Sequence, residues 1–205
     1  MTATPILAAI LAVKDQPVDL FLAEIAARAR RSGLRVAGFL QHRGQDTKEC
    51  CRDIEIEHIT TGAVHIISQS LGSGSSGCKL DPQALAAVAG SLRAEIDSGA
   101  DLLILNRFGK GETEGHGFRA LIETAYAREI PVLTVVRDSY ADGWREFAGD
   151  CGLLLAPNSK DVNDWFNRLF TPTLEQETQS SESPETVVSF QDTSAESKIL
   201  RPAEI

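Results

Sequence analysis

Residues 5–19 read Pro-Ile-Leu-Ala-Ala-Ile-Leu-Ala-Val-Lys-Asp-Gln-Pro-Val-Asp, and this stretch decides the fold class. The apolar run from Ile6 to Val13 has the length of a strand buried on both faces, and it is far shorter than the roughly 20 residues of a membrane span. Pro17 then stands where a first helical turn tolerates it, and apolar residues recur at helical spacing as far as Ala29, before Gly33 provides a stop. A buried strand followed by a helix predicts an α/β fold.

The rest of the chain repeats this alternation of apolar runs and helical patterns. Alternation in residues 53–59, a turn at Thr61-Gly62 and a return through Val64 to Ser68 predict an inserted antiparallel β-hairpin. We therefore expect a doubly wound, mostly parallel sheet. Its further strands are expected at 34–41, 102–105, 131–136 and 152–156, and its further helices at 81–97, with Asp81 as N-cap, 118–128, 144–147 and 161–170.

Composition limits the classes of protein that remain. The chain has 205 residues with 20 basic and 29 acidic side chains, a formal charge of −9, which argues against nucleic acid as the main partner. We expect one domain over residues 1–170 in a cytoplasmic protein, followed by an acidic, disordered tail over 171–205 with seven acids and two bases. Cys50 and Cys51 with His42 and His58 fit no zinc spacing, so no metal site is predicted.

A phosphate-binding loop would stand between the opening strand and helix, and the sequence there does not contain its pattern. No glycine occurs between Met1 and Ser32, and Pro17 removes an amide donor from the turn. Asp15 and Asp19 would repel a triphosphate at the helix end that should attract it. The later strand ends at Asn106-Arg107, where magnesium-dependent nucleotide hydrolases carry an acid. The absence of a phosphate-binding loop and the absence of an acid at 106–107 both predict that ATP is not hydrolysed. No catalytic residue is predicted.

Several short stretches carry a resemblance to a known family. They are Arg35 to Gln41, Ile67-Ser68-Gln69, Gly77 to Asp81, and Leu105 to Lys110 with Glu112 and Gly115. Over about residues 5–170 the chain resembles bacterial proteins of the domain of unknown function family numbered 2478. That family is more distantly similar to P-loop nucleoside triphosphatases and to the adaptor of molybdenum-cofactor guanylylation. The resemblance implies a degenerate P-loop NTPase-like fold and a link to molybdenum handling, because members often lie near molybdate-transport genes.

Two glycine-rich loops remain as candidate walls of one ligand site at the carboxyl edge of the sheet. The first, within Leu71 to Leu80, offers backbone amides, hydroxyls and a cation for a tetrahedral oxyanion. Cys78 beside Lys79 is either a reactive thiol or a small buried side chain. The predicted ligand-binding residues of this part are Gln69, Gly72, Ser73, Gly74, Ser75, Ser76, Gly77, Cys78 and Lys79.

The second loop, residues 106–117, interleaves charges with four glycines directly after a buried strand. Arg107 and Lys110 would clamp an anion, and Glu112 or Glu114 would orient a base, a metal or Lys110. His116 is either a titrating group or a solvated side chain. The predicted ligand-binding residues here are Asn106, Arg107, Gly109, Lys110 and Glu112.

These observations favour a binding protein over an enzyme. The leading hypothesis is a protein that binds a small anionic ligand, an oxyanion or a nucleotide, and that takes part in molybdenum handling. Molybdate and a nucleotide both remain open as the ligand. One alternative is a nucleoside triphosphatase with a relocated phosphate site, in which Lys79 and Asp81 replace the usual Lys and acid. Another is a regulatory adaptor that faces a protein partner or a second copy of the chain.

Overall fold

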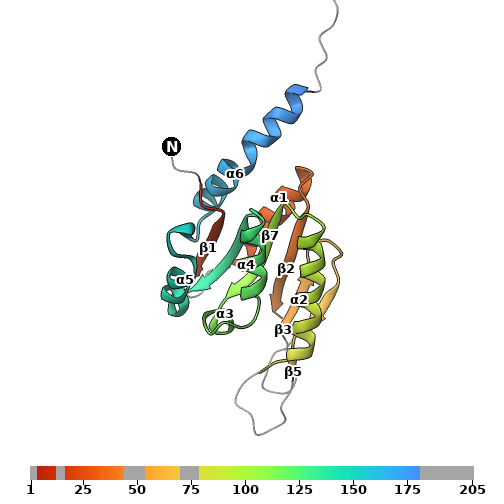
Figure 1. Cartoon of the computed structure of the whole chain (residues 1–205), viewed down its shortest axis with the longest axis vertical. Coiled ribbons are helices and arrows are strands. Elements are labelled where there is room, and N and C mark those ends of the chain that lie inside the picture. Colours follow the sequence, from red (N-terminus) through yellow and green to blue (C-terminus); the bar gives the residue numbers. More distant parts are fainter. Residues whose placement is uncertain (1–3, 13–16, 44–53, 70–78, 181–205) are drawn as a thin grey trace, which may run out of the picture.

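The computed structural model describes residues 4–12, 17–43, 54–69 and 79–180, and within them it forms a seven-stranded sheet covered on both faces (Figure 1). The strand order is β4-β3-β2-β7-β8-β1-β9. Five strands are parallel: β1 (Leu7–Ala12), β2 (Val36–Arg43), β7 (Leu102–Phe108), β8 (Val132–Arg137) and β9 (Gly152–Leu155).

The predicted hairpin is confirmed, and it extends the sheet at one edge. β3 (Ile54–His58) pairs antiparallel with β2, and β4 (Val64–Ile66) pairs antiparallel with β3. A separate two-stranded ribbon, β5 (Ser68–Gln69) and β6 (Lys79–Leu80), joins the hairpin to the next helix. The fold is therefore the mixed α/β, mostly parallel sheet that the sequence predicts.

Two apolar layers hold the helices to the sheet. On one face α1 (Asp19–Arg31) and α6 (Ser159–Ser180) pack through side chains such as Leu22, Trp165 and Phe166. The other face carries α2 (Pro82–Asp97), α4 (Arg119–Ala127) and α5 (Ala141–Ala148). Burial of both sheet faces explains why the parallel strands β1, β7, β8 and β9 are mostly apolar.

Local sequence signals set most helix ends as predicted. The carboxylate of Asp81 accepts hydrogen bonds from the backbone N–H groups of Gln83 and Ala84, and Pro82 is the first residue of α2. Gly99 after α2 has φ +93°, which a glycine adopts without strain. Pro17 lies two residues before α1 rather than in its first turn. Within the described residues, no helix has the length and apolar character needed to span a bilayer.

Several expected boundaries differ from the structure, and three of them bear on the predicted loops or the domain end. β7 continues through Asn106 and Arg107 to Phe108, so the predicted second loop begins three residues later. Lys79 and Leu80, expected in the first loop, form β6 because they pair with Gln69 and Ser68. α6 passes the predicted domain end at Phe170 and runs to Ser180. The remainder of the predicted tail, residues 181–205, lies outside the described residues.

Candidate functional site

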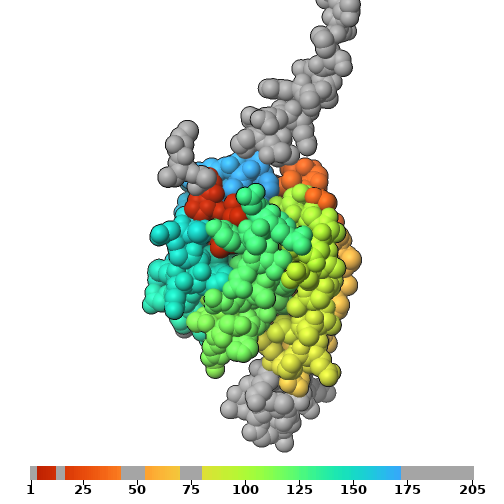
Figure 2. Space-filling view, viewed as in Figure 1, coloured from red at the N-terminus to blue at the C-terminus, as the bar shows by residue number. Residues whose placement is uncertain are grey.

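A cavity of about 460 Å³ lies at the carboxyl ends of β2, β7 and β8. This volume falls within the range of small-molecule sites, and the carboxyl edge is where open parallel sheets bind ligands. In Figure 2 the light-green surface of the segment after β7 adjoins the yellow-green surface of α2 at the lower end of the body. The lining residues are Gln41, Ile54, Ile67, Leu80, Leu85, Asn106, Arg107, Phe108, Gly109, Lys110, Gly111, Glu112, His116, Gly117, Phe118, Arg137 and Tyr140.

The end of β7 is bulged where it enters the cavity. Its pairing with β8 shifts register between Leu105 and Phe108, and Arg107 has φ +93°, a strained value for a residue with a side chain. Asn106 donates from Nδ2 to Oδ1 of Asp19 at 3.1 Å, and Nη2 of Arg107 lies 3.6 Å from Oδ2 of Asp19. Asp19 opens α1, so the bulge ties the end of β7 to the start of that helix.

Glu112 holds the segment after β7 in shape. Its side chain is buried, its Oε2 accepts from the Gly109 N–H at 3.0 Å, and its Oε1 accepts from the Phe118 N–H at 2.9 Å. The chain between these two amides includes the short helix α3 (Lys110–Thr113). Of the two acids expected to orient a base, a metal or Lys110, Glu112 has no ion pair with Lys110 among the described residues, whereas Glu114 does. Both carboxylate oxygens serve backbone amides, and Lys110 instead lies 3.7 Å from Glu114.

Cationic side chains gather on this cavity beside an apolar wall. Arg107, Lys110 and Arg137 all line it, as does His116. In the described part of the chain the guanidinium of Arg137 has neither a hydrogen bond nor an ion pair, and its side chain is exposed. The apolar wall is formed by Ile54, Ile67, Leu80, Leu85, Phe108, Phe118 and Tyr140. Such a cavity can hold an anionic group at its cations and an organic group against its wall.

The predicted site residues fall into three groups. Asn106, Arg107, Gly109, Lys110 and Glu112 all line the cavity. Gln69 does not line it and donates from Nε2 to the carbonyl of Leu80 at 3.3 Å, while Lys79 lies in β6. Gly72, Ser73, Gly74, Ser75, Ser76, Gly77 and Cys78 lie outside the described residues. Because Leu80 lines the cavity, the end of the first predicted loop does border the same site.

Sequence reasoning missed Arg137 and Tyr140, and it treated Asp19 only as a repelling charge. Arg137 ends β8, the parallel neighbour of β7, so its place at the carboxyl end of the strand after Pro131 was an available signal. Among the described residues, no cluster of three or more His, Cys, Asp or Glu side chains is placed to hold a metal. The paired cysteines Cys50 and Cys51 lie outside those residues.

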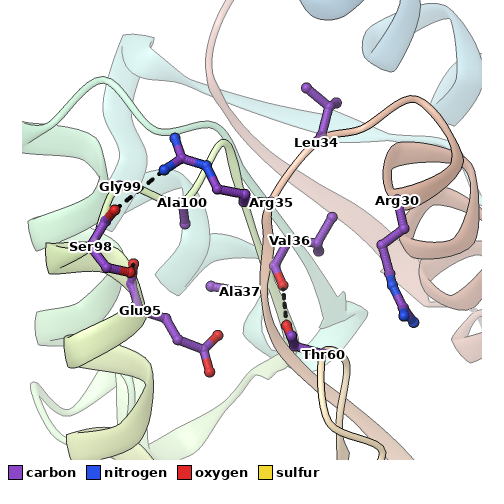
Figure 3. Close-up of a pocket in the computed structure, with 10 residues that line it drawn as sticks. All are labelled: Arg30, Leu34, Arg35, Val36, Ala37, Thr60, Glu95, Ser98, Gly99 and Ala100. Atoms are coloured by element: carbon purple, nitrogen blue, oxygen red, sulfur yellow. Dashed lines mark hydrogen bonds between the residues drawn. The ribbon is translucent and has the colours of Figure 1, made fainter.

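A second cavity, of about 290 Å³, lies at the amino end of β2 and β7, the opposite edge of the sheet (Figure 3). Its charged groups are largely occupied by protein partners. Arg35 donates to Ser98 and forms an ion pair with Asp101, and Glu95 contacts the buried His58. The backbone N–H groups of Thr60 and Thr61 both donate to Nδ1 of His58. The Nε2–H of His58 is then the donor to Glu95, so this ring is built into the fold.

The Arg35–Asp101 pair beside this cavity predicts a local acid sensitivity. Hydrogen bonds from Arg35 hold the pKa of the Asp101 carboxyl below its ordinary value. The ionised carboxylate therefore stabilises the fold above its ordinary pKa, about 4, and that stabilisation disappears as the pH falls through its lowered value. We expect Asp101→Asn to flatten the acid limb of thermal stability between about pH 5 and pH 2. A melting temperature of Asp101→Asn that falls with decreasing pH as steeply as that of the wild type would contradict this.

The sequence of this chain is similar to a family model and to two curated proteins. A family model described as "Protein of unknown function (DUF2478)" matches residues 7–165. The molybdenum import ATP-binding protein ModC 2 of Bradyrhizobium diazoefficiens is 33% identical over 159 residues, which cover 78% of this chain and 18% of that protein. The β subunit of a glycine–tRNA ligase from Dechloromonas aromatica is 38% identical over 69 residues, 34% of this chain and 10% of that protein. The chain thus spans less than a fifth of either curated relative.

The crystal structure of THEP1 from the hyperthermophile Aquifex aeolicus has a similar fold. Its TM-score is 0.56 at 15% identity, over 80% of this chain and 98% of that chain. At this identity the likeness shows the fold alone.

Proposed function

We propose that this chain, which belongs to the DUF2478 family of proteins of unknown function, is a binding protein for a small organic anion. Its ancestry is that of P-loop NTPases, as its likeness to ModC 2 and THEP1 indicates. The observation that carries the proposal is the cavity at the carboxyl ends of β7 and β8. Among the described residues, three permanently or strongly basic side chains line it, and the one acidic side chain that lines it, Glu112, is engaged by backbone amides.

The apolar wall favours an organic anion over a bare oxyanion as the ligand. A free oxyanion gains nothing from Phe108, Phe118 and Tyr140, whereas a planar or aliphatic group packed against them loses apolar surface to the protein. The anionic end of the same ligand would meet Arg107 and Arg137, and charge-assisted hydrogen bonds of this kind contribute about 1.5–3 kcal/mol each. A nucleotide or another phosphate-bearing organic molecule satisfies both requirements.

The site is proposed to bind its ligand without a divalent cation. Asn106, at the end of β7, offers no charge to a metal, and Arg107 beside it repels one. Mg²⁺ would then compete with the protein for a phosphate group rather than bridge the two. A nucleoside triphosphatase with a relocated site requires the opposite dependence. Magnesium-dependent phosphate release that is lost in Lys79→Ala would support the enzyme and contradict a binding protein.

The likeness to ModC 2 supports a second candidate function, the binding of molybdate itself in molybdenum handling. Both candidates use the same cations, and calorimetry separates them. The titrants are AMP, ATP, GTP, inorganic phosphate and molybdate up to millimolar concentration, each with EDTA and with Mg²⁺. An organic anion is expected to bind more tightly than free phosphate or molybdate. Tight binding of molybdate alone would favour the second function, and absence of binding by every titrant would overturn both.

Removal of the Arg137 charge tests the location of the site. We expect Arg137→Gln to weaken binding of the titrant that binds best by about 10- to 100-fold, which corresponds to one charge-assisted hydrogen bond. Arg145→Gln is the matched control, because Arg145 is an exposed arginine on α5 that pairs with Asp142 outside the cavity. Equal affinities of Arg137→Gln and the wild type would place the anion elsewhere.

A further inference from the structure

Asp19 puts a negative charge beside the cations of the proposed site. It is the first residue of α1, and its carboxylate is reached by two consecutive residues of β7, Asn106 through a hydrogen bond and Arg107 through an ion pair. Arg107 lines the cavity, whereas Asp19 does not. The guanidinium that an anionic ligand would meet is therefore shared with a carboxylate of the protein.

A favourable interaction with the helix dipole explains an acid anywhere in the first turn of α1, but it does not explain this arrangement. In the bulge, Arg107 adopts a positive φ, which is a strained conformation for a residue with a side chain. Strained backbone of this kind is retained where surrounding contacts fix it. Asp19 is one of those contacts. Its side chain remains 38% exposed, so its charge is not buried by the pairing.

We propose that Asp19 is an internal countercharge that weakens anion binding at Arg107 in proportion to the charge of the ligand. This inference rests on the proposed function and concerns how the charge of the ligand affects its affinity. An anion bound at Arg107 is repelled by Asp19, and the Coulomb energy is proportional to the ligand's charge. Asp19 therefore costs a triphosphate more binding free energy than it costs an anion of one or two charges, such as a carboxylate or a phosphate monoester. Among nucleotides, the penalty from Asp19 is smallest for a monophosphate.

The test neutralises Asp19 without changing its shape. Asp19→Asn keeps an oxygen that can accept from Nδ2 of Asn106 and removes only the charge. We expect Asp19→Asn to bind a monoanion about threefold more tightly than the wild type and a dianion about tenfold, because a doubled charge squares the ratio of affinities. Both gains should shrink as salt is raised from low ionic strength to about 0.15 M. The probes are nitrate and sulfate for the charge series, and AMP and ATP for the ligand class.

Asp97→Asn is the matched control, since it removes one charge at the far end of α2, on the opposite edge of the sheet. Its anion affinities should equal those of the wild type, and circular dichroism melts show that each variant is folded. Equal or weaker affinity in Asp19→Asn, or a gain independent of ligand charge, overturns the inference while the proposed function stands. Binding by Asp19→Asn alone supports the inference. Binding by neither protein overturns the proposed function as well.

Discussion

Glu112→Ala is expected to lower the free energy of unfolding by about 2–6 kcal/mol, because it leaves two amides without their acceptor. Those amides, Gly109 N–H and Phe118 N–H, stand at the two ends of the segment that carries Lys110 into the cavity. A small domain has about 5–15 kcal/mol of stability in total, so the loss is a large share of it. Urea unfolding followed by circular dichroism measures the change.

Glu114→Ala is the matched control for this prediction. Glu114 lies two residues away on the same segment, but its side chain is 57% exposed and its partner is Lys110 at 3.7 Å. A surface pair of this kind contributes about 1 kcal/mol or less. Glu112→Gln keeps the size of the side chain and one good acceptor, so its loss should lie between the two alanine variants. Similar unfolding curves for Glu112→Ala and Glu114→Ala would contradict the role given to Glu112.

The same substitution links the fold to the proposed function. Without its acceptor, the segment between Gly109 and Phe118 no longer holds one geometry, and the cations and the aromatic wall of the cavity lose their fixed separation. Anion affinity should therefore fall in Glu112→Ala even at temperatures where the protein remains folded. Glu114→Ala should keep the wild-type affinity within a few fold, since it removes a charge from the rim alone.

The order of strands and helices could be predicted because it depends on local patterns. Apolar runs such as 6–13 and 102–105 predicted strands buried on both faces, and the pair Asp81-Pro82 predicted the start of a helix. The two extra strand residues Asn106 and Arg107 could not be predicted, since polar side chains at a strand end read as loop. They remain in β7 because Asp19, 87 positions earlier than Asn106, supplies their partner.

The candidate site was predictable in place but not in role. Arg107, Lys110 and Glu112 were selected for their charge, and all three line the cavity. Charge alone does not reveal that one carboxylate is buried among backbone amides, because an acidic residue in a glycine-rich segment is ordinarily solvated. Arg137 went unnoticed for a related reason. It follows an apolar strand that has no glycine-rich loop after it, and only the parallel pairing of β7 and β8 brings it to the same edge.

The interior of the sheet makes one further demand that a sequence pattern does not show. Gly38 lies in β2 with φ +141°, opposite Ile104 of β7. A Cβ atom at Gly38 would stand 1.9 Å from the carbonyl oxygen of Ile104, less than any non-bonded contact. Because the obstacle is backbone in the middle of a parallel pair, β2 and β7 would have to separate. The close approach of these strands also fixes where Gln41 and Arg107 reach the cavity from their ends.

Gly38→Ala is accordingly expected to destabilise the protein by more than about 4 kcal/mol, which places most of it in the unfolded state or in aggregates at 37 °C.

Two other glycines separate the effect of the steric clash from the effect of the backbone conformation. Gly33 has φ +80° with nothing within 4 Å of its Cβ position, so Gly33→Ala should cost about 1–2 kcal/mol from the backbone conformation alone. Gly90 lies inside α2 with similar open space, and Gly90→Ala should gain about 0.5–1 kcal/mol from helix propensity. Melting temperatures and soluble yields that decrease in the order Gly90→Ala, wild type, Gly33→Ala, Gly38→Ala support this account. A Gly38→Ala protein that melts within a few degrees of the wild type would show that β2 and β7 do not need this contact, and the strand ends that shape the cavity would then be free to shift.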